Sequence, residues 1–157
     1  MGDGGGMVLG SGSSLWNNPG YRLIKLGELV MFAIEQALAP LEVTPRQFNV
    51  LATAAALDSP SQQELSRALG IDPNVMVGLI DDLERSGIVE RRRNPEDRRR
   101  YMVALTPHGK ELLNSCIAVM HETEKRFFAP LADDEVAALN DAAGRLLTAH
   151  PRPPKRH

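Results

Sequence analysis

Apolar residues recur every three to four positions along several stretches of the chain, which is the period of an α-helix with one buried face. The first stretch runs from Tyr21 to Ala39, where Pro40 is expected to end the helix. Its apolar face is formed by Leu23, Leu26, Val30, Ile34 and Leu38. Stretches at 108–128 and from 133 to about 150 predict two further long helices. The chain is therefore expected to be mainly helical.

Helix-capping residues mark three shorter helices that begin near residues 45, 62 and 73. Ser61 and Glu64 form the capping-box pattern at the start of the second of them. Gly70 follows that helix at the position of a left-handed C-terminal cap, and Asp72 caps the third helix, which is expected to end near Ser86. Two capped helices joined by a tight glycine turn predict a helix-turn-helix.

Directly after the helix-turn-helix, apolar residues recur at every second position, which is the period of a β-strand. Tyr101, Val103 and Leu105 alternate with other residues and are expected to lie on one face of a strand. The segment 88–92 is short and begins with apolar residues, and the turn-forming residues 93–97 separate it from that strand. The predicted fold class is mainly α with a small β-hairpin wing, a winged helix-turn-helix with flanking helices.

Length and composition limit the number of domains and the class of protein that the chain can form. A chain of 157 residues with 43% hydrophobic and 24% charged residues is of ordinary size and composition for one globular domain. We expect a flexible Gly/Ser-rich leader at 1–18, a folded part at 19–150 and a tail at 151–157. One cysteine excludes a disulfide framework within a single chain. Without a signal-peptide pattern or a run of about 20 apolar residues, a cytoplasmic protein with no membrane contact is expected.

Charge is distributed unevenly along the chain. The net charge is −2, but residues 91–100 contain six arginines against Glu96 and Asp97 and so carry +4. The remainder of the chain is therefore acidic, and one concentrated basic segment indicates a polyanionic partner that is met at one place. The alternative is a solvated loop that is merely rich in arginine.

The third short helix has the properties of a DNA-reading helix. Met76, Leu79, Ile80 and Leu83 form its expected buried stripe. The residues left facing outward are Asn74, Val75, Val77, Gly78 and Asp81. Asparagine can pair with adenine through two hydrogen bonds, valine can contact a thymine methyl, and glycine permits close approach. The alternative for the two valines is that they are ordinary, partly buried residues of the protein.

Further candidate DNA contacts flank that helix. Helix N-termini attract phosphate, which makes Ser61 and Gln62 candidate backbone contacts. Arginines at a hairpin tip suit a narrow A·T-rich minor groove, and Asp97 is expected to orient the guanidinium of Arg99. The other arginines assigned to DNA, with contacts to flanking phosphates expected, are Arg91, Arg98 and Arg100.

Several motifs at their expected spacing resemble the multiple-antibiotic-resistance regulator (MarR) family of bacterial transcription factors. The clearest is Leu-Glu-x-x-Gly-Ile-Val-x-Arg, followed by Asp-Arg-Arg and Leu-Thr. The segments that carry the resemblance are 41–51, which includes Gln47 as a further candidate DNA contact, 61–66, 70–72, 83–91, 95–99 and 105–109. The resemblance extends from about Tyr21 to Ala149.

The resemblance implies an obligate homodimer that binds double-stranded DNA. The DNA-binding part would span about 41–106, and the dimerisation helices would span about 20–39 and 108–150. Symmetry then implies a palindromic operator, with half-sites roughly one helical turn apart. Many relatives carry Thr and Arg where Val77 and Gly78 stand, so base recognition here is expected to depend on Asn74, methyl contacts and groove shape.

The resemblance also implies a repressor that a small, amphipathic effector releases from DNA in the bacterial cytoplasm, where it is associated with the nucleoid. Candidate pocket residues are Trp16, Tyr21, Met31, Phe32 and Phe48, although ordinary packing explains each of them as well. No cofactor is expected.

Other kinds of chemistry find little support in the sequence. Cys116 lies among apolar residues and is expected to be a buried, inert thiol rather than a sensor. His108, Cys116 and His121 do not share a helix face, so no metal site is expected. The chain lacks a recognisable catalytic constellation, and we expect no enzyme. The alternative function is a winged-helix module for protein–protein contact without specific DNA binding.

Overall fold

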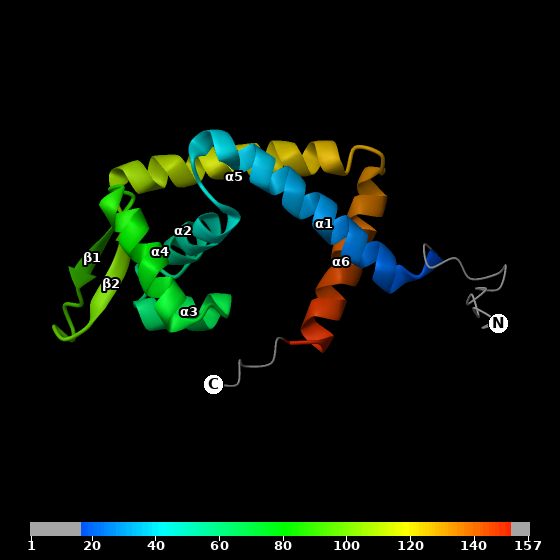
Figure 1. The fold of residues 1–157 in the computed structure, drawn as a ribbon. Coiled ribbons are helices and arrows are strands. Elements are labelled where there is room, and N and C mark those ends of the chain that lie inside the picture. The colour runs from blue at the N-terminus through cyan, green and yellow to red at the C-terminus, as the bar shows by residue number, and fades with distance from the viewer. Residues whose placement is uncertain (1–16, 152–157) are drawn as a thin grey trace, which may run out of the picture.

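The computed structural model describes residues 17–151, so the predicted leader up to residue 16, Trp16 and the tail from 152 lie outside the described residues. The described residues form six α-helices, a short 3₁₀ turn and one hairpin, and Figure 1 shows their arrangement. The elements are α1 (Pro19–Leu38), η2 (Ala39–Leu41), α2 (Pro45–Ala56), α3 (Gln62–Leu69), α4 (Pro73–Arg85), β1 (Val89–Arg93), β2 (Tyr101–Leu105), α5 (Pro107–Phe127) and α6 (Asp133–Ala149).

The ends of α1 differ from the sequence prediction. The helix begins at Pro19, because the Asn18 side chain accepts a hydrogen bond from the backbone N–H of Gly20 (2.9 Å) and caps it. This is another cap followed by proline, a signal that the periodicity alone does not reveal. At the other end, Pro40 lies within η2, and α1 ends at Leu38.

The caps of the three shorter helices are confirmed. Ser61 Oγ accepts from the N–H of Glu64 (3.3 Å), and the Glu64 carboxylate accepts from the N–H of Ser61 (2.7 Å). The Asp72 carboxylate accepts from the N–H of Asn74 (2.8 Å) at the start of α4. Gly70 has the left-handed conformation predicted for it, with φ of 61°. The helix-turn-helix is therefore built from local hydrogen bonds that the sequence encodes.

The hairpin is antiparallel, and Val89 pairs with Leu105 at its inner end. Tyr101, Val103 and Leu105 lie on one face of β2 as predicted; Val103 and Leu105 are buried, whereas Tyr101 is 49% exposed. Tyr101 pairs with Arg93 at the far end of the ladder, beyond the edge of the core. There the Arg93 guanidinium lies 6.0 Å from the centre of the tyrosine ring.

One hydrophobic core holds the helix-turn-helix and the hairpin together. The core joins α2, α3, α4, both strands and the first part of α5. Its buried members are Val50, Leu51, Ala54, Leu65, Met76, Ile80, Leu83, Val89, Val103, Leu105 and Leu113. Because this core includes the buried stripe of α4, it fixes which face of that helix is left to solvent.

A second, smaller core joins α1 to α5. It contains Leu38, Val43 and Cys116, and Phe48 packs against both cores. In Figure 1, α5 runs from the hairpin across the molecule, the C-terminal part of α1 meets α5, and α6 runs down from the far end of α5. Within residues 17–151, no helix is both long enough and apolar enough to span a membrane.

Candidate nucleic-acid interface

The outer face of α4 carries the side chains that the sequence assigned to base recognition. Asn74 is exposed, and Val75 and Val77 are 43% and 39% exposed. The buried stripe of Met76, Ile80 and Leu83 occupies the opposite face. The two valines therefore face outward, and packing within the described residues does not explain why these two positions are apolar.

Gly78 leaves the backbone of α4 open between these side chains. A Cβ atom built at this position would meet nothing within 4 Å. Its φ is not in the left-handed region, so neither packing nor backbone geometry within the described residues requires a glycine. A glycine inside a helix lowers its stability by roughly 0.5–1 kcal/mol relative to alanine. Close approach of an external partner to the helix backbone gives a physical reason for a glycine here despite this loss of stability.

The tip of the hairpin presents the predicted arginines. Arg98, Arg99 and Arg100 are exposed, and the Asn94 side chain shapes the turn by accepting from the N–H of Glu96 (2.8 Å). The predicted partner of Asp97 is wrong. Its carboxylate accepts from the backbone N–H of Arg99 (3.1 Å), while its ion pair is with the Nε of Arg100 (3.4 Å).

Arg91 lies in different surroundings from the arginines of the tip. Its guanidinium contacts the carboxylates of Asp81 and Glu84 on α4. Burial disfavours the charged form of this side chain, but the hydrogen bonds and negative charges of both carboxylates outweigh burial and raise the pKa of Arg91. The structure thus directs Arg91 toward the recognition helix, although the sequence grouped it with the phosphate contacts.

The remaining predicted DNA contacts have structural partners of their own. Ser61 donates its hydroxyl to the Glu64 carboxylate (2.8 Å), and Gln62 Oε1 lies 3.5 Å from the guanidinium of Arg91. Gln47 accepts from the backbone N–H of Thr44 (2.9 Å) and closes the capping box of α2. Gln47 is therefore a cap residue in this structure.

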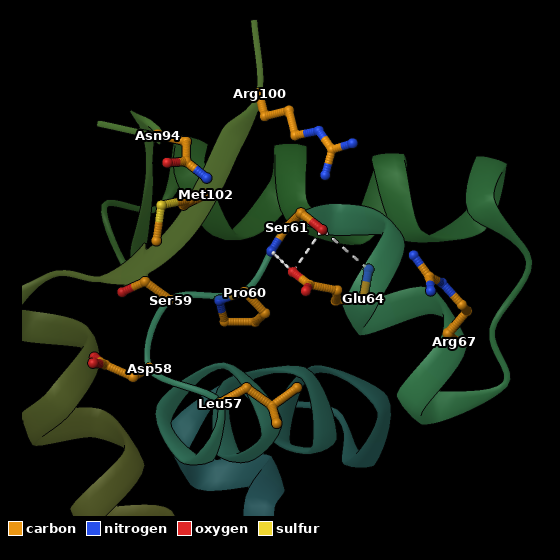
Figure 2. Close-up of a pocket in the computed structure, with 10 residues that line it drawn as sticks. All are labelled: Leu57, Asp58, Ser59, Pro60, Ser61, Glu64, Arg67, Asn94, Arg100 and Met102. Carbon is orange, nitrogen blue, oxygen red and sulfur yellow. Dashed lines mark hydrogen bonds between the residues drawn. The ribbon is translucent and has the colours of Figure 1, made fainter. Parts of the chain in front are cut away.

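A cavity of about 540 Å³ opens between the α2–α3 loop, the start of α3 and β2. Figure 2 shows Arg100 above Ser61 and Arg67 to the right of Glu64, with Met102 and Pro60 to the left of Glu64. Hydrogen bonds from Ser61, with smaller contributions from the two arginines, lower the pKa of Glu64. Arg67 belongs to no motif in the sequence, and its one signal is its position three residues after Glu64 on the same helix face.

The predicted effector residues that lie within 17–151 belong to α1 and α2. Met31 and Phe32 are exposed on α1, whereas Phe48 is half-buried between the two cores. Tyr21 lies near the start of α1, where the ammonium of Lys25 is 5.8 Å from its ring centre.

Cys116 is fully buried as predicted, and burial raises the pKa of its thiol. A buried thiol with a raised pKa contains little of the reactive thiolate at neutral pH. Across residues 17–151, no group of three His, Cys, Asp or Glu side chains is arranged to hold a metal ion.

Comparison with known proteins gives one consistent result. A family model for the MarR family matches residues 43–101. The multiple antibiotic resistance protein MarR of Escherichia coli (strain K12) is 30% identical over 137 residues, which cover 82% of this chain and 92% of that protein.

Two solved structures are similar over most of their length. A transcriptional repressor, CouR, bound to a 23-mer DNA duplex has a TM-score of 0.77 and 30% identity, covering 84% of this chain and 94% of that one. CouR from Rhodococcus jostii RHA1 bound to p-coumaroyl-CoA has a TM-score of 0.75 and 29% identity, covering 91% and 99%. With its winged helix and a curated relative that matches over most of both chains, this protein belongs to the MarR family.

Proposed function

We propose that this protein is a dimeric, sequence-specific DNA-binding regulator that represses transcription from palindromic operators and is released by a small-molecule effector. One observation carries the proposal. The exposed face of α4 lies beside a hairpin whose tip presents three exposed arginines. A helix for the major groove and a cationic wing for an adjacent groove are the two parts that such binding needs.

In the major groove, α4 would present Asn74 to an adenine edge and Val75 or Val77 to thymine methyl groups. Gly78 would let the helix backbone approach the base edges closely. These contacts contain few charges, so they supply sequence preference rather than most of the affinity.

In the minor groove, Arg98 and Arg99 would insert where an A·T-rich sequence narrows the groove and strengthens its negative potential. Arg100, held by Asp97, would contact a flanking phosphate. Each neutralised phosphate makes binding more sensitive to salt, with a slope of about −0.9 in log K against log salt.

The proposal divides the chain by role. Residues 41–106 bind DNA, and helices within 20–39 and 108–150 join two copies. Exposed apolar side chains of α1, α5 and α6 support this division, among them Leu29, Ile117 and Leu147. Two copies related by a two-fold axis then place two α4 helices on half-sites about one helical turn apart.

The effector part of the proposal is supported by the relative whose structure holds p-coumaroyl-CoA. We place the effector pocket between the dimerisation helices and the winged domain. Its candidate lining residues are Met31 and Phe32, which are exposed on α1, with Tyr21, Phe48 and Trp16. We also propose a bacterial cytoplasmic protein with a regulatory and not a catalytic role.

The experiment measures how much of a pool of random DNA duplexes is retained by the wild type and by an Arg98→Ala, Arg99→Ala double variant, over a range of salt concentrations. We expect the wild type to retain DNA with a steep salt dependence, and the double variant to bind weakly with a shallower slope. A wild type that retains no duplex would contradict the proposal and favour the alternative, a winged-helix module for protein–protein contact. Equal retention by the two proteins would contradict the role proposed for the wing arginines. Size-exclusion chromatography checks that both proteins have the same oligomeric state.

A further inference from the structure

Arg91 differs from its neighbours in how far its side chain is withdrawn from solvent. It is 23% exposed, whereas Arg92 on the same strand is 62% and Arg100 at the tip is 74% exposed. We propose that Arg91 is a positioning residue that locks the wing against α4 and α3, and so sets the distance between the wing arginines and the base-facing residues of α4. This inference rests on the proposed function.

The contacts of Arg91 join three elements. Its Nη2 donates to Asp81 Oδ1 (2.6 Å), and its Nη1 pairs with the carboxylate of Glu84, both on α4. The backbone N–H of Arg91 also donates to Glu84 Oε1 (3.0 Å). Nη2 lies 3.5 Å from Gln62 Oε1 on α3. One side chain of β1 therefore connects the wing to both helices of the helix-turn-helix.

The chemistry of this site requires an arginine. Asp81 and Glu84 are three residues apart and so lie on the same face of α4. A guanidinium presents several N–H donors in a rigid plane, which lets it bind two carboxylates and an amide at once. A lysine ammonium has the same charge but a compact head on a flexible stem, and it cannot reproduce that geometry.

A wing locked by Arg91 and simple electrostatics predict opposite changes in DNA affinity when a carboxylate of α4 is removed. Asp81 and Glu84 add negative charge to a helix that faces a polyanion, so deleting either charge should strengthen DNA binding if charge alone matters. If the carboxylates hold Arg91, and Arg91 holds the wing, deletion should weaken binding. The two accounts can therefore be separated by the direction of one change in affinity.

The test compares Asp81→Ala and Glu84→Ala with Asp82→Ala. The control removes the same charge from the same helix, but Asp82 pairs with Arg85 (2.8 Å) and not with Arg91. Affinity for a duplex selected by the wild type is measured by fluorescence anisotropy over a range of salt concentrations. We expect Asp81→Ala and Glu84→Ala to weaken binding roughly tenfold, the scale of one lost pair coupling. Asp82→Ala should bind equally or more tightly.

The Arg91→Lys variant distinguishes positioning from direct phosphate contact. It keeps the charge, so a phosphate contact predicts nearly unchanged affinity. Positioning predicts weaker binding with the same salt slope as the wild type. Unchanged affinity of Arg91→Lys, or tighter binding of Asp81→Ala and Glu84→Ala, would overturn the inference. Thermal unfolding of each variant separates lost affinity from lost folding.

Amide hydrogen exchange in the free protein provides a readout that does not depend on DNA. If Arg91 locks the wing, Glu84→Ala and Arg91→Lys should exchange faster at the amides of β1 and β2 than the wild type and Asp82→Ala. Equal exchange in all four proteins would overturn the inference. A wild type that binds no duplex would overturn the proposed function, and hydrogen exchange would still decide whether the wing is locked.

Discussion

Gly109 fixes the position of α5 against the hairpin. A Cβ atom at this position would lie 2.0 Å from the carbonyl oxygen of Ile88, a backbone atom that cannot rotate away. Thr106 strengthens the same junction, because its hydroxyl donates to the carbonyl of Gly87 (2.6 Å) and accepts from the N–H of Gly109 (3.0 Å). The long helix and the wing therefore meet through backbone contact.

The Gly109→Ala substitution should lower the free energy of unfolding by about 1–3 kcal/mol, because the added methyl group must displace backbone. Urea denaturation of the wild type and the variant measures the difference. Gly144→Ala is the control, since a Cβ there meets nothing within 4 Å. A Gly109→Ala protein as stable as the wild type would contradict the packing described here.

Glu64 links the stability of α3 to pH. Its pKa is lowered in the folded protein by hydrogen bonds from Ser61, so its contribution to stability is present above the unfolded pKa of about 4.3 and is lost as the pH falls through the folded pKa. Glu64→Gln keeps the capping pattern without the titrating group. Its thermal midpoint should therefore fall less than that of the wild type between pH 6 and about pH 3. Parallel midpoint curves would contradict this assignment.

At the scale of the element, helix starts and turns follow from local signals that the sequence displays. The 62–69 helix has its predicted bounds because its cap, capping box and terminal glycine are contiguous in the chain. The first strand is shifted by one residue, since the Ile88 N–H donates to the Leu83 carbonyl at the end of α4 (2.9 Å), while β1 extends at its far end to Arg93, which pairs with Tyr101. Local chemistry can be read from the chain, but such long-range pairings cannot.

The same limit applies at the site. Alternation predicts that Tyr101 shares a face with Val103, but it does not reveal where the core beneath that face ends. A count of charges places Arg91 and Arg98 in the same group. Only the packing of β1 on α4 shows that Arg91 points inward and Arg98 points outward. The outward valines of α4 were predictable because one helix period determines both faces.

Gly78→Ala should affect the stability of α4 and its function in opposite directions. The added methyl group meets open space, so the free energy of unfolding should rise by about 0.5–1 kcal/mol. The same methyl group would separate the helix from the base edges, and affinity for a selected duplex should fall. Urea denaturation and fluorescence anisotropy measure the two effects. A variant that is more stable and binds equally well would show that DNA does not approach Gly78 closely.

At the scale of the whole molecule, the long helices leave an unusual amount of apolar surface exposed. On α1, this surface includes Leu23, Ile24, Leu26, Leu29 and Phe32. Helix α6 has few contacts with the rest of the described chain and exposes Leu146 and Leu147. Exposed apolar surface of this extent is typical of an interaction site, which supports the proposal that two copies pack through these helices.

Leu29→Glu should weaken dimerisation, because it places a charge on the exposed apolar side of α1. Light scattering coupled to size-exclusion chromatography should detect monomer in this variant at concentrations where the wild type is dimeric. Leu57→Glu is the matched control, since Leu57 is similarly exposed but lies at the end of α2. Monomer in both variants or in neither would contradict the assigned interface.

Selection of binding sites from random duplexes tests the central claim most directly. The account predicts a palindromic consensus with half-sites about one helical turn apart, bound by two copies of the chain, with an A·T-rich segment where the wing inserts. Arg98→Ala with Arg99→Ala should remove the preference for that segment. A selection that yields no consensus, or a consensus without two-fold symmetry, would contradict the account of a dimer that reads DNA through α4 and the wing.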